Sequence, residues 1–574
     1  VVQTGTVETP STMTLDLAAN LGEVTRASGN LTIDAFGFFK VSGALALNKN
    51  TTTVKLGDLA STTDVNESTN AVTVEQLTIG GSGLTAFAGI NGGSADPTGL
   101  NLTGVNFAVA IQTEKTPAEG KTAREWTAVK ASATGANFVG VSGLTVTASA
   151  INVEITRKAA DNTLVDYTVQ NQVVQTGTVE TPSTMTLDLA ANLGEVTRAS
   201  GNLTIDAFGF FKVSGALALN KNTTSVTLGN LSGTPADESA TPVVVEQLTI
   251  GGSGLTAFAG INGGSADPTG LNLTGVNFAV AIQTEKNPTA PAVAREWTAV
   301  KASATGANFV GVSGLTVSAT AIDIAITRKA TDNTLVDYNA QNLAVQTSTT
   351  ASPSTMTLDL AANLGEVTRA SGNLTIDAFG FFQVSGALAL NKNTTSVTLG
   401  NLSGTPADES ATPVVVEQLT LGGSGLTAFA GINGGSADPT GLNLTGVNFA
   451  LAIQTEKNPT APALAREWTA VKASATGANF VGVSGLTVSA SAIDIAITRK
   501  ATDNTLVDYN AQSLAVQTST TANPSTMTLD LAANLGEVTR ASGNLTVDAF
   551  GFFQVSGALA FNKNTTSVTL GNLS

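Results

Sequence analysis

The side chains that could do chemistry in this chain are few, and their types exclude the commonest catalytic and metal-binding reactions. Cysteine and histidine are both absent from the 574 residues. Their absence removes thiolate nucleophiles, disulfides, thiolate metal sites and the imidazole base, together with the commonest zinc ligands. Carboxylates remain, and they support oxygen-ligand cation sites or the paired acid–base chemistry of glycoside hydrolysis.

Three aspartates at turns are the candidates for a calcium site. Asp96 lies in NGGSADPTG (91–99), and Asp161 and Asp166 lie in ADNTLVDY (160–167). The Asp-Pro and Gly signals also predict ordinary turns here, so each aspartate has a plain structural explanation. We therefore expect no cofactor, with calcium at these aspartates as the alternative.

One short cluster, formed by Arg124, Glu125 and Trp126, joins charge to an aromatic ring. A guanidinium beside an indole could form a cation–π pair, and the ring could form a platform on which a sugar stacks. The same tryptophan could instead cover the edge of a core. Trp126 is therefore a candidate ligand-binding residue with a structural alternative.

These candidates recur at a fixed spacing because the chain is one sequence written about three and a third times. All four methionines occupy one position of the repeat, and the three tryptophans and the three tyrosines each do the same. A repeat this long is a whole domain, a pair of domains or several coils. We expect repeats at 1–172, 173–343 and 344–514 and a partial repeat at 515–574, as a segment of a longer chain.

Alternating apolar residues predict strands through most of each repeat. In the first copy the strongest strand signals are 30–50, 100–115 and 138–158, whereas the glycine-rich stretch 80–99 is predicted to form turns. In 100–115 the apolar residues change phase at Gly104, which indicates a bulge or a corner. Stretch 138–158 changes phase once in the same way.

Two all-β architectures fit this pattern. The leading prediction is an elongated repeat array of β-solenoid-like coils, in which short strands turn at Gly, Asn and Ser corners and stack along an axis. The alternative is a row of tandem β-sandwich domains. Aromatic residues are 5% of the chain, and no proline-rich linker separates the copies, which favours stacked coils.

Composition narrows the functional class. Hydrophobic residues make up 42% of the chain, which is enough for a core, and the net charge is −16 with only 12% charged residues. A sparsely charged acidic chain lacks the clustered Lys and Arg that phosphate binding needs, so we expect no nucleic-acid partner. It also disfavours anionic membrane surfaces, and no apolar run is long enough for a membrane helix, so we expect no membrane insertion in this segment.

The near-identical long repeats, strands such as VSGALAL and SGLTVSASAIDIAI, and the lack of cysteine together resemble the giant adhesins or haemagglutinin-like surface proteins of bacteria. The resemblance covers the whole chain and is compositional. It implies an extracellular or cell-surface location and a role in adhesion, biofilm or a cell-spanning filament.

The resulting functional hypothesis is a non-enzymatic rod, spacer or filament within a long extracellular fibre or surface protein. Its stacked strands would carry load, its variable loops at 60–70 and 116–123 would face outward, and its partners would be other copies of itself or neighbouring repeats. The rival is an adhesin with one carbohydrate or calcium site per repeat, whose partners would be cell-surface glycans. A polysaccharide-active enzyme is a third hypothesis.

Overall fold

The computed structural model describes residues 1–15, 23–57, 71–229, 242–288, 293–349, 353–400, 413–457, 459, 464–520 and 524–564. The described chain is all-β, which confirms the predicted class. It divides into two compact units. Unit 1 comprises Val1–Leu203, Ala218–Thr224 and Thr349–Ala351, and unit 2 comprises Thr204–Leu217, Ser225–Ser348 and Ser352–Ser574.

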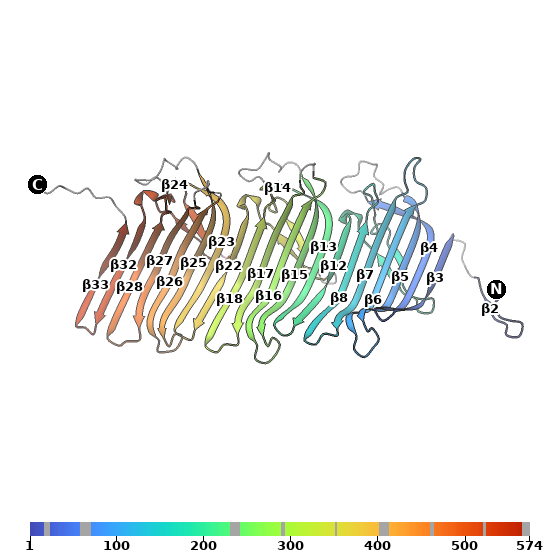
Figure 1. The fold of residues 1–574 in the computed structure, drawn as a ribbon, viewed down its shortest axis with the longest axis horizontal. Coiled ribbons are helices and arrows are strands. Elements are labelled where there is room, and N and C mark those ends of the chain that lie inside the picture. The colour runs from blue at the N-terminus through green and yellow to red at the C-terminus, as the bar shows by residue number, and fades with distance from the viewer. Residues whose placement is uncertain are drawn as a thin grey trace. The chain divides into compact units, whose positions relative to one another are not determined.

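Unit 1 is built on long antiparallel strands, each hydrogen-bonded to the next along the chain (Figure 1). They are β3 (Val24–Ala35), β4 (Phe39–Gly57), β5 (Ala71–Ile90), β6 (Thr98–Glu114), β7 (Glu125–Val139) and β8 (Leu144–Arg157). The next two strands, β12 (Val196–Ala207) and β13 (Phe211–Val226), have residues in both units.

Unit 2 repeats the same order of strands twice. They are β15 (Val243–Ile261), β16 (Thr269–Glu285), β17 (Glu296–Val310), β18 (Leu315–Arg328), β22 (Val367–Ala378), β23 (Phe382–Val397), β25 (Val414–Ile432), β26 (Thr440–Glu456), β27 (Glu467–Val481), β28 (Leu486–Arg499), β32 (Val538–Ala549) and β33 (Phe553–Asn564). Every consecutive pair among them is antiparallel.

Short elements form a second layer over one end of these strands. They are β9 (Leu164–Val165), β10 (Gln172–Gln175), β11 (Thr184–Leu187), η2 (Ala191–Leu193), β14 (Leu228–Gly229), β19 (Leu335–Val336), β20 (Leu343–Gln346), β21 (Thr355–Leu358), η3 (Ala362–Leu364), β24 (Leu399–Gly400), β29 (Leu506–Val507), β30 (Leu514–Gln517), β31 (Thr526–Leu529) and η4 (Ala533–Leu535). A further pair, β1 (Val2–Gln3) and β2 (Thr12–Met13), lies at the N-terminus.

The hydrophobic core lies between the long strands and this second layer, and it recurs once per copy. In the third copy it joins Trp468, Ala450 and Val416 of the sheet to Val516 and Leu529 of β30 and β31. Each core therefore combines the end of one sequence repeat with the beginning of the next. The predicted repeat boundaries cut through the packing units.

The solenoid prediction is wrong. A solenoid stacks coil upon coil, whereas here consecutive strands form antiparallel hairpins and hydrogen-bond to their chain neighbours. The sandwich alternative does not describe the architecture either. Successive copies are joined by sheet pairing, as between β18 and β22 and between β28 and β32, so they are not separate domains.

The stretch 30–50, predicted as strand, contains a hairpin turn that separates β3 from β4. The chain turns at Phe36–Phe38, where Phe36 and Gly37 have positive φ angles of 54° and 71°. Such angles are those of the two-residue turns that match strand twist. The Asp34 carboxylate accepts a hydrogen bond from the Gly37 N–H (2.9 Å), and Lys40 bonds the same carboxylate at 2.7 Å. Asp34 therefore closes a turn.

Candidate functional site

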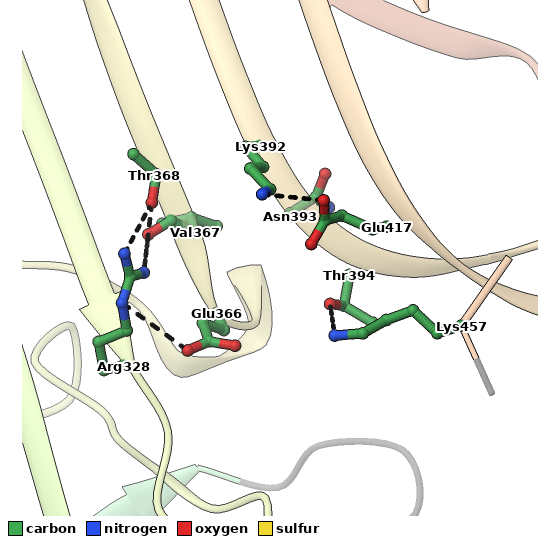
Figure 2. Close-up of a pocket in the computed structure, with 9 residues that line it drawn as sticks. All are labelled: Arg328, Glu366, Val367, Thr368, Lys392, Asn393, Thr394, Glu417 and Lys457. Carbon is green, nitrogen blue, oxygen red and sulfur yellow. Dashed lines mark hydrogen bonds and ion pairs between the residues drawn. The ribbon is translucent and has the colours of Figure 1, made fainter. Parts of the chain in front are cut away.

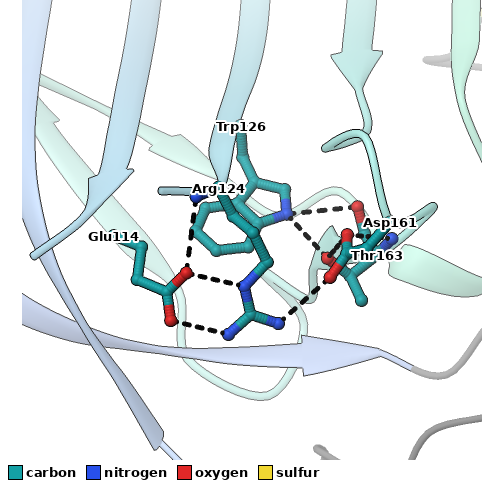
Figure 3. Close-up of polar contacts among 5 residues, drawn as sticks. All are labelled: Glu114, Arg124, Trp126, Asp161 and Thr163. Carbon is teal, nitrogen blue, oxygen red and sulfur yellow. Dashed lines mark hydrogen bonds and ion pairs between the residues drawn. The ribbon is translucent and has the colours of Figure 1, made fainter. Parts of the chain in front are cut away.

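The cluster predicted at Arg124–Trp126 is a structural clamp. Figure 3 shows the Arg124 guanidinium between two carboxylates, with Nε and Nη2 donating to Glu114 (3.0 Å each) and Nη1 to Asp161 (3.2 Å). The guanidinium lies 5.3 Å from the centroid of the Trp126 ring. The indole N–H donates to the backbone oxygen of Thr163 at 3.1 Å. These contacts tie β7 of the sheet to the loop that contains Asp161 and Thr163.

Trp126 is 1% exposed, so its ring offers no surface on which a sugar could stack. The ring takes the core position that was the structural alternative. The equivalent tryptophans, Trp297 and Trp468, are buried to the same extent and make the same contacts. A glycan platform at this residue is therefore excluded by burial in all three copies.

In the third copy of this clamp, hydrogen bonds hold the two carboxylates, Glu456 and Asp503, ionised. In the third copy, hydrogen bonds from Arg466 lower the pKa of Glu456. Burial alone would raise the pKa of Asp503, but hydrogen bonds from Thr505 and Arg466 outweigh it and lower the pKa. The arrangement stabilises an arginine and leaves no protonated carboxyl group to act as a general acid near neutral pH.

The clamp predicts acid sensitivity. Because the folded pKa values of Glu456 and Asp503 lie below the ordinary values of 4.5 and 3.8, their stabilisation is complete above about pH 5 and is lost as the pH falls below 3.8. Tryptophan fluorescence followed from pH 7 to pH 2 should show the buried indoles becoming exposed in that lower range. A Glu456→Gln variant, combined with the same change at Glu114 and Glu285, should flatten this transition. An unchanged acid midpoint would contradict the assignment.

A second polar network, which the sequence reading did not identify, crosses the core. The Tyr338 hydroxyl donates to Gln283 Oε1 (2.7 Å), and Gln283 Nε2 donates to Gln247 Oε1 (2.8 Å). Burial raises the pKa of the Tyr338 phenol, so it remains a neutral donor. Three buried polar side chains thus satisfy one another. A sequence signal for this network exists, because Gln247 alternates with Val245 and Thr249 on the buried side of β15. A glutamine at such a position needs a hydrogen-bond partner in the core.

The three calcium candidates are not brought together. Asp96 is exposed on its loop. Asp161 accepts hydrogen bonds from Thr163 as well as Arg124, and Asp166 accepts hydrogen bonds from Thr168. Within the described part of the chain, no group of three acidic side chains could hold a metal ion.

Of the two variable loops, residues 60–70 lie outside the described residues. Residues 116–123 are exposed apart from a half-buried Pro117, as the outward-facing prediction requires.

The largest unassigned feature is the face of the long strands that lies opposite the second layer, which we name the apolar face. On β26 it carries Leu442, Leu444, Val447, Phe449, Leu451 and Ile453, because residues that alternate along a strand share one side. The core residues Ala450 and Ala452 lie on the other side of the same strand. Directly opposite residues share a face, so Leu451 is flanked by Leu421 of β25 and Val471 of β27.

Bulges keep this face apolar along the whole strand. In β26 the apolar positions shift from even to odd numbers at Gly446, whose φ of 60° suits glycine. In β28 the equivalent shift, from Val488 to Ile493, occurs at Ala492 with a φ of 49°. The phase changes predicted in the first copy are therefore bulges, and their consequence is a single continuous apolar surface.

Nothing among the described residues covers the apolar face of unit 2. None of the six large apolar side chains of β26 on this face is buried, and Leu442 is 43% exposed. One repeat contributes six strands. At a spacing of ~4.8 Å between strands and ~3.3 Å per residue from Leu442 to Ile453, the apolar face of one repeat has an area of about 1,000 Å². The largest apolar patch on a typical monomer is about 300–600 Å². An exposed apolar surface of this size marks a candidate interaction site.

The apolar face has distinct borders at its two ends. At the turn end, phenylalanines project into solvent: Phe379, Phe381 and Phe382 are 58%, 60% and 46% exposed. At the other end the alternation that carries Leu388 and Leu390 continues into Lys392 and Thr394. The opposite side of the strands near the turns is mostly polar, as in the row Asp377, Gln383, Asn443 and Asn479, in which Phe429 also lies.

The charged end of the apolar face forms a hollow of about 170 Å³, which we name the charged hollow (Figure 2). Arg328 donates from Nη1 and Nη2 to Thr368 Oγ1 (3.2 Å each), and its Nε lies 4.0 Å from Glu366. Lys392 bonds Glu417 at 2.8 Å. The described part of the first copy has an equivalent hollow lined by Lys49, Lys115 and Glu75 among others.

No helix in the described part of the chain is long and apolar enough to cross a membrane.

No family model matches the sequence, and no curated protein matches it either. Three solved structures show weak similarity. The siderophore receptor PiuA from Acinetobacter baumannii is 11% identical, with a TM-score of 0.19, over 94% of this chain and 80% of that chain. The RagAB peptide importer is 7% identical, with a TM-score of 0.15, over 91% and 62%. The alcaligin outer-membrane receptor FauA from Bordetella pertussis is 10% identical, with a TM-score of 0.14, over 93% and 68%.

The three structures are receptors and an importer, and none is a fibre or an adhesin. The hypothesis of a stacked-coil rod, spacer or filament is wrong, because the load-bearing stack it requires is absent from the antiparallel sheets. Its adhesin rival loses its sugar platform to the burial of Trp126.

Proposed function

We propose that this chain is a non-enzymatic, lipid-binding β-sheet protein of the cell envelope, whose apolar face contacts the hydrocarbon of a lipid assembly. The observation that carries the proposal is the uncovered apolar face. Its apolar side chains on β26 run from Leu442 to Ile453 with no polar residue among them on that side. At ~3.3 Å per residue this is about 36 Å, close to the roughly 30 Å hydrocarbon thickness of a bilayer.

Hydrocarbon is favoured over a protein partner because the apolar face offers no hydrogen bonds along β26. Protein interfaces carry about one hydrogen bond per 100–200 Å², so a face of this size would be expected to present several polar groups to a protein. Acyl chains need none. The borders agree with this choice, since phenylalanines at one end and lysine and arginine at the other suit the boundary between hydrocarbon and headgroups. The proposed location in the cell envelope would supply such a lipid assembly.

The test adds one charge per repeat to the apolar face and measures binding to vesicles. Val109, Val280 and Leu451 occupy equivalent places on β6, β16 and β26, opposite the buried alanines of each core. The triple change to aspartate should reduce co-sedimentation with neutral phosphatidylcholine vesicles at least tenfold, because a carboxylate cannot be desolvated in hydrocarbon without a partner.

The matched control places the same three charges on the polar side. Asn101, Asn272 and Asn443 occupy equivalent positions there, and their triple change to aspartate should leave vesicle binding unaltered. Buried-tryptophan fluorescence verifies folding of both variants. The proposal is overturned if the native chain does not bind vesicles, or if the apolar-face variant binds as well as the control. A second copy of this chain is the competing occupant of the apolar face, and sedimentation velocity would detect it as a stable dimer. If the changes at Val109, Val280 and Leu451 dissociate that dimer, the partner is a second copy and the proposal is overturned.

A further inference from the structure

We propose that the charged hollow binds the phosphate of an anionic lipid headgroup at the border of the apolar face. This inference rests on the proposed function and deepens it, because it names the class of lipid and says which end of the strands lies at headgroup level. Three cations and two carboxylates from the second and third copies line the charged hollow, which gives it a net positive charge within a chain whose overall charge is −16.

The cations come from separate strands and converge at one place. Arg328 ends β18, Lys392 lies on β23, and Lys457 follows the last residue of β26. Each cation continues the alternation of apolar-face residues on its strand. Arg328 lies two residues after Ile326, and Lys392 lies two residues after Leu390. The hollow therefore opens on the same side as the apolar face. A lipid whose acyl chains lie on that face would present its headgroup here.

The donors suit a phosphoryl oxygen. Side-chain exposures of 49% for Arg328 and 48% for Lys392 leave both groups accessible to a ligand. The Lys457 ammonium donates to the Thr394 hydroxyl at 3.2 Å, a neutral acceptor, whereas Lys392 is bound to the Glu417 carboxylate. Guanidinium and ammonium groups together provide the fork and the point charge that phosphate recognition uses. Lys457 is the cation with the least charge compensation among these contacts.

A related hollow occurs in unit 1, where two lysines and two glutamates line it and leave it without net charge. Lys115 donates to Thr51 at 2.9 Å, and Lys49 bonds Glu75 at 2.9 Å. The hollow there is lined by Glu23 and Thr25 but by no arginine. A lysine–threonine pair and a lysine–glutamate pair are thus common to both hollows. The lysine that donates to threonine is the one to remove in a test.

The experiment compares full-length chain on phosphatidylcholine vesicles and on vesicles containing phosphatidylglycerol at low ionic strength. With a net charge of −16, a chain without a dedicated site should bind the anionic vesicles more weakly. We expect the opposite preference, by at least threefold. The variant Lys115→Gln, Lys286→Gln and Lys457→Gln should lose the preference while keeping its binding to phosphatidylcholine.

The control removes the same charge elsewhere. Lys158, Lys329 and Lys500 occupy one repeat position, and Lys158 and Lys329 bond asparagines in the loop after the strand. Their triple change to glutamine should retain the preference. Equal or weaker binding of the native chain to anionic vesicles overturns the headgroup assignment and leaves the proposed function standing. Absence of binding to either vesicle overturns both. Abolition of the preference by millimolar inorganic phosphate would assign the hollow to free phosphate and overturn the lipid assignment.

Discussion

Replacing Trp468 by alanine is expected to destabilise the third repeat by about 3–5 kcal/mol, the usual cost of removing a large buried aromatic side chain. Trp468 is 1% exposed and belongs to the core that joins the sheet to β30 and β31. Its indole N–H donates to Thr505, and its ring lies 5.4 Å from the Arg466 guanidinium. The substitution would leave a cavity and also remove the partner that positions the arginine between its carboxylates.

Amide hydrogen exchange is the suitable measurement, because a chain of coupled repeats need not unfold in one step. Protection should fall in β26, β27, β30 and β31, while β16 and β17, which surround Trp297, keep theirs. The control is Phe381→Ala, a change of another aromatic residue whose side chain is 60% exposed, with an expected effect within about 0.5 kcal/mol. Equal protection in the Trp468→Ala and Phe381→Ala variants would show that the clamp is dispensable.

Local features of the fold could be read from the sequence. The alternation of Leu100 and Leu102 followed by Val105 and Phe107 predicted a strand interrupted at Gly104, and the structure places a bulge there. This succeeded because side-chain parity depends only on the strand itself. The prediction of turns over the glycine-rich stretch 80–99 was right only in part: β5 runs to Ile90, and the turn follows it. Gly80, Gly81 and Gly89 lie on this strand where another chain segment or side chain approaches closely.

Long-range arrangement could not be read in the same way. Parity shows that both sides of a strand are apolar, but not whether the covering layer is another coil, another sheet or lipid. The choice between stacked coils and hairpins depends on which strands pair, and a hairpin turn such as Phe36–Phe38 is only three residues long. The second layer comes from Val174 and Leu187, which belong to the following repeat.

The candidate sites show the same division. Trp126 could be recognised as part of a charged aromatic cluster from three adjacent residues. Its core position and the contacts of the cluster involve residues far along the chain, such as Val174, Asp161 and Thr163. The charged hollow was not anticipated, because Arg328, Lys392 and Lys457 are each ordinary strand-end cations in the sequence. Only the pairing of five successive strands, β18, β22, β23, β25 and β26, brings them to one border.

Gly422→Val is expected to detach the second layer of the third repeat, at a cost of about 3 kcal/mol, the upper range for overpacking a filled site. A Cβ atom at Gly422 would lie 2.1 Å from the backbone oxygen of Gln517 and 3.0 Å from Thr518 Cγ2. The obstacle is backbone, so no rotamer change can relieve it. Gly422 pairs with Ala389 and Ala450, so it belongs to a row of small residues on the covered side of the sheet, across which β30 passes.

Limited proteolysis between 510 and 530, together with hydrogen exchange in β30 and β31, would detect the detachment, and the long strands should keep their protection because their own pairing is unaffected. Gly557→Val is the control, since a Cβ atom there meets nothing within 4 Å and its φ is not in the positive range. If Gly422→Val leaves β30 and β31 as protected as the control does, the close approach is not required for docking. If it exposes them, the same row of small residues explains why the second layer lies on that side of the sheet and why the opposite side is left uncovered.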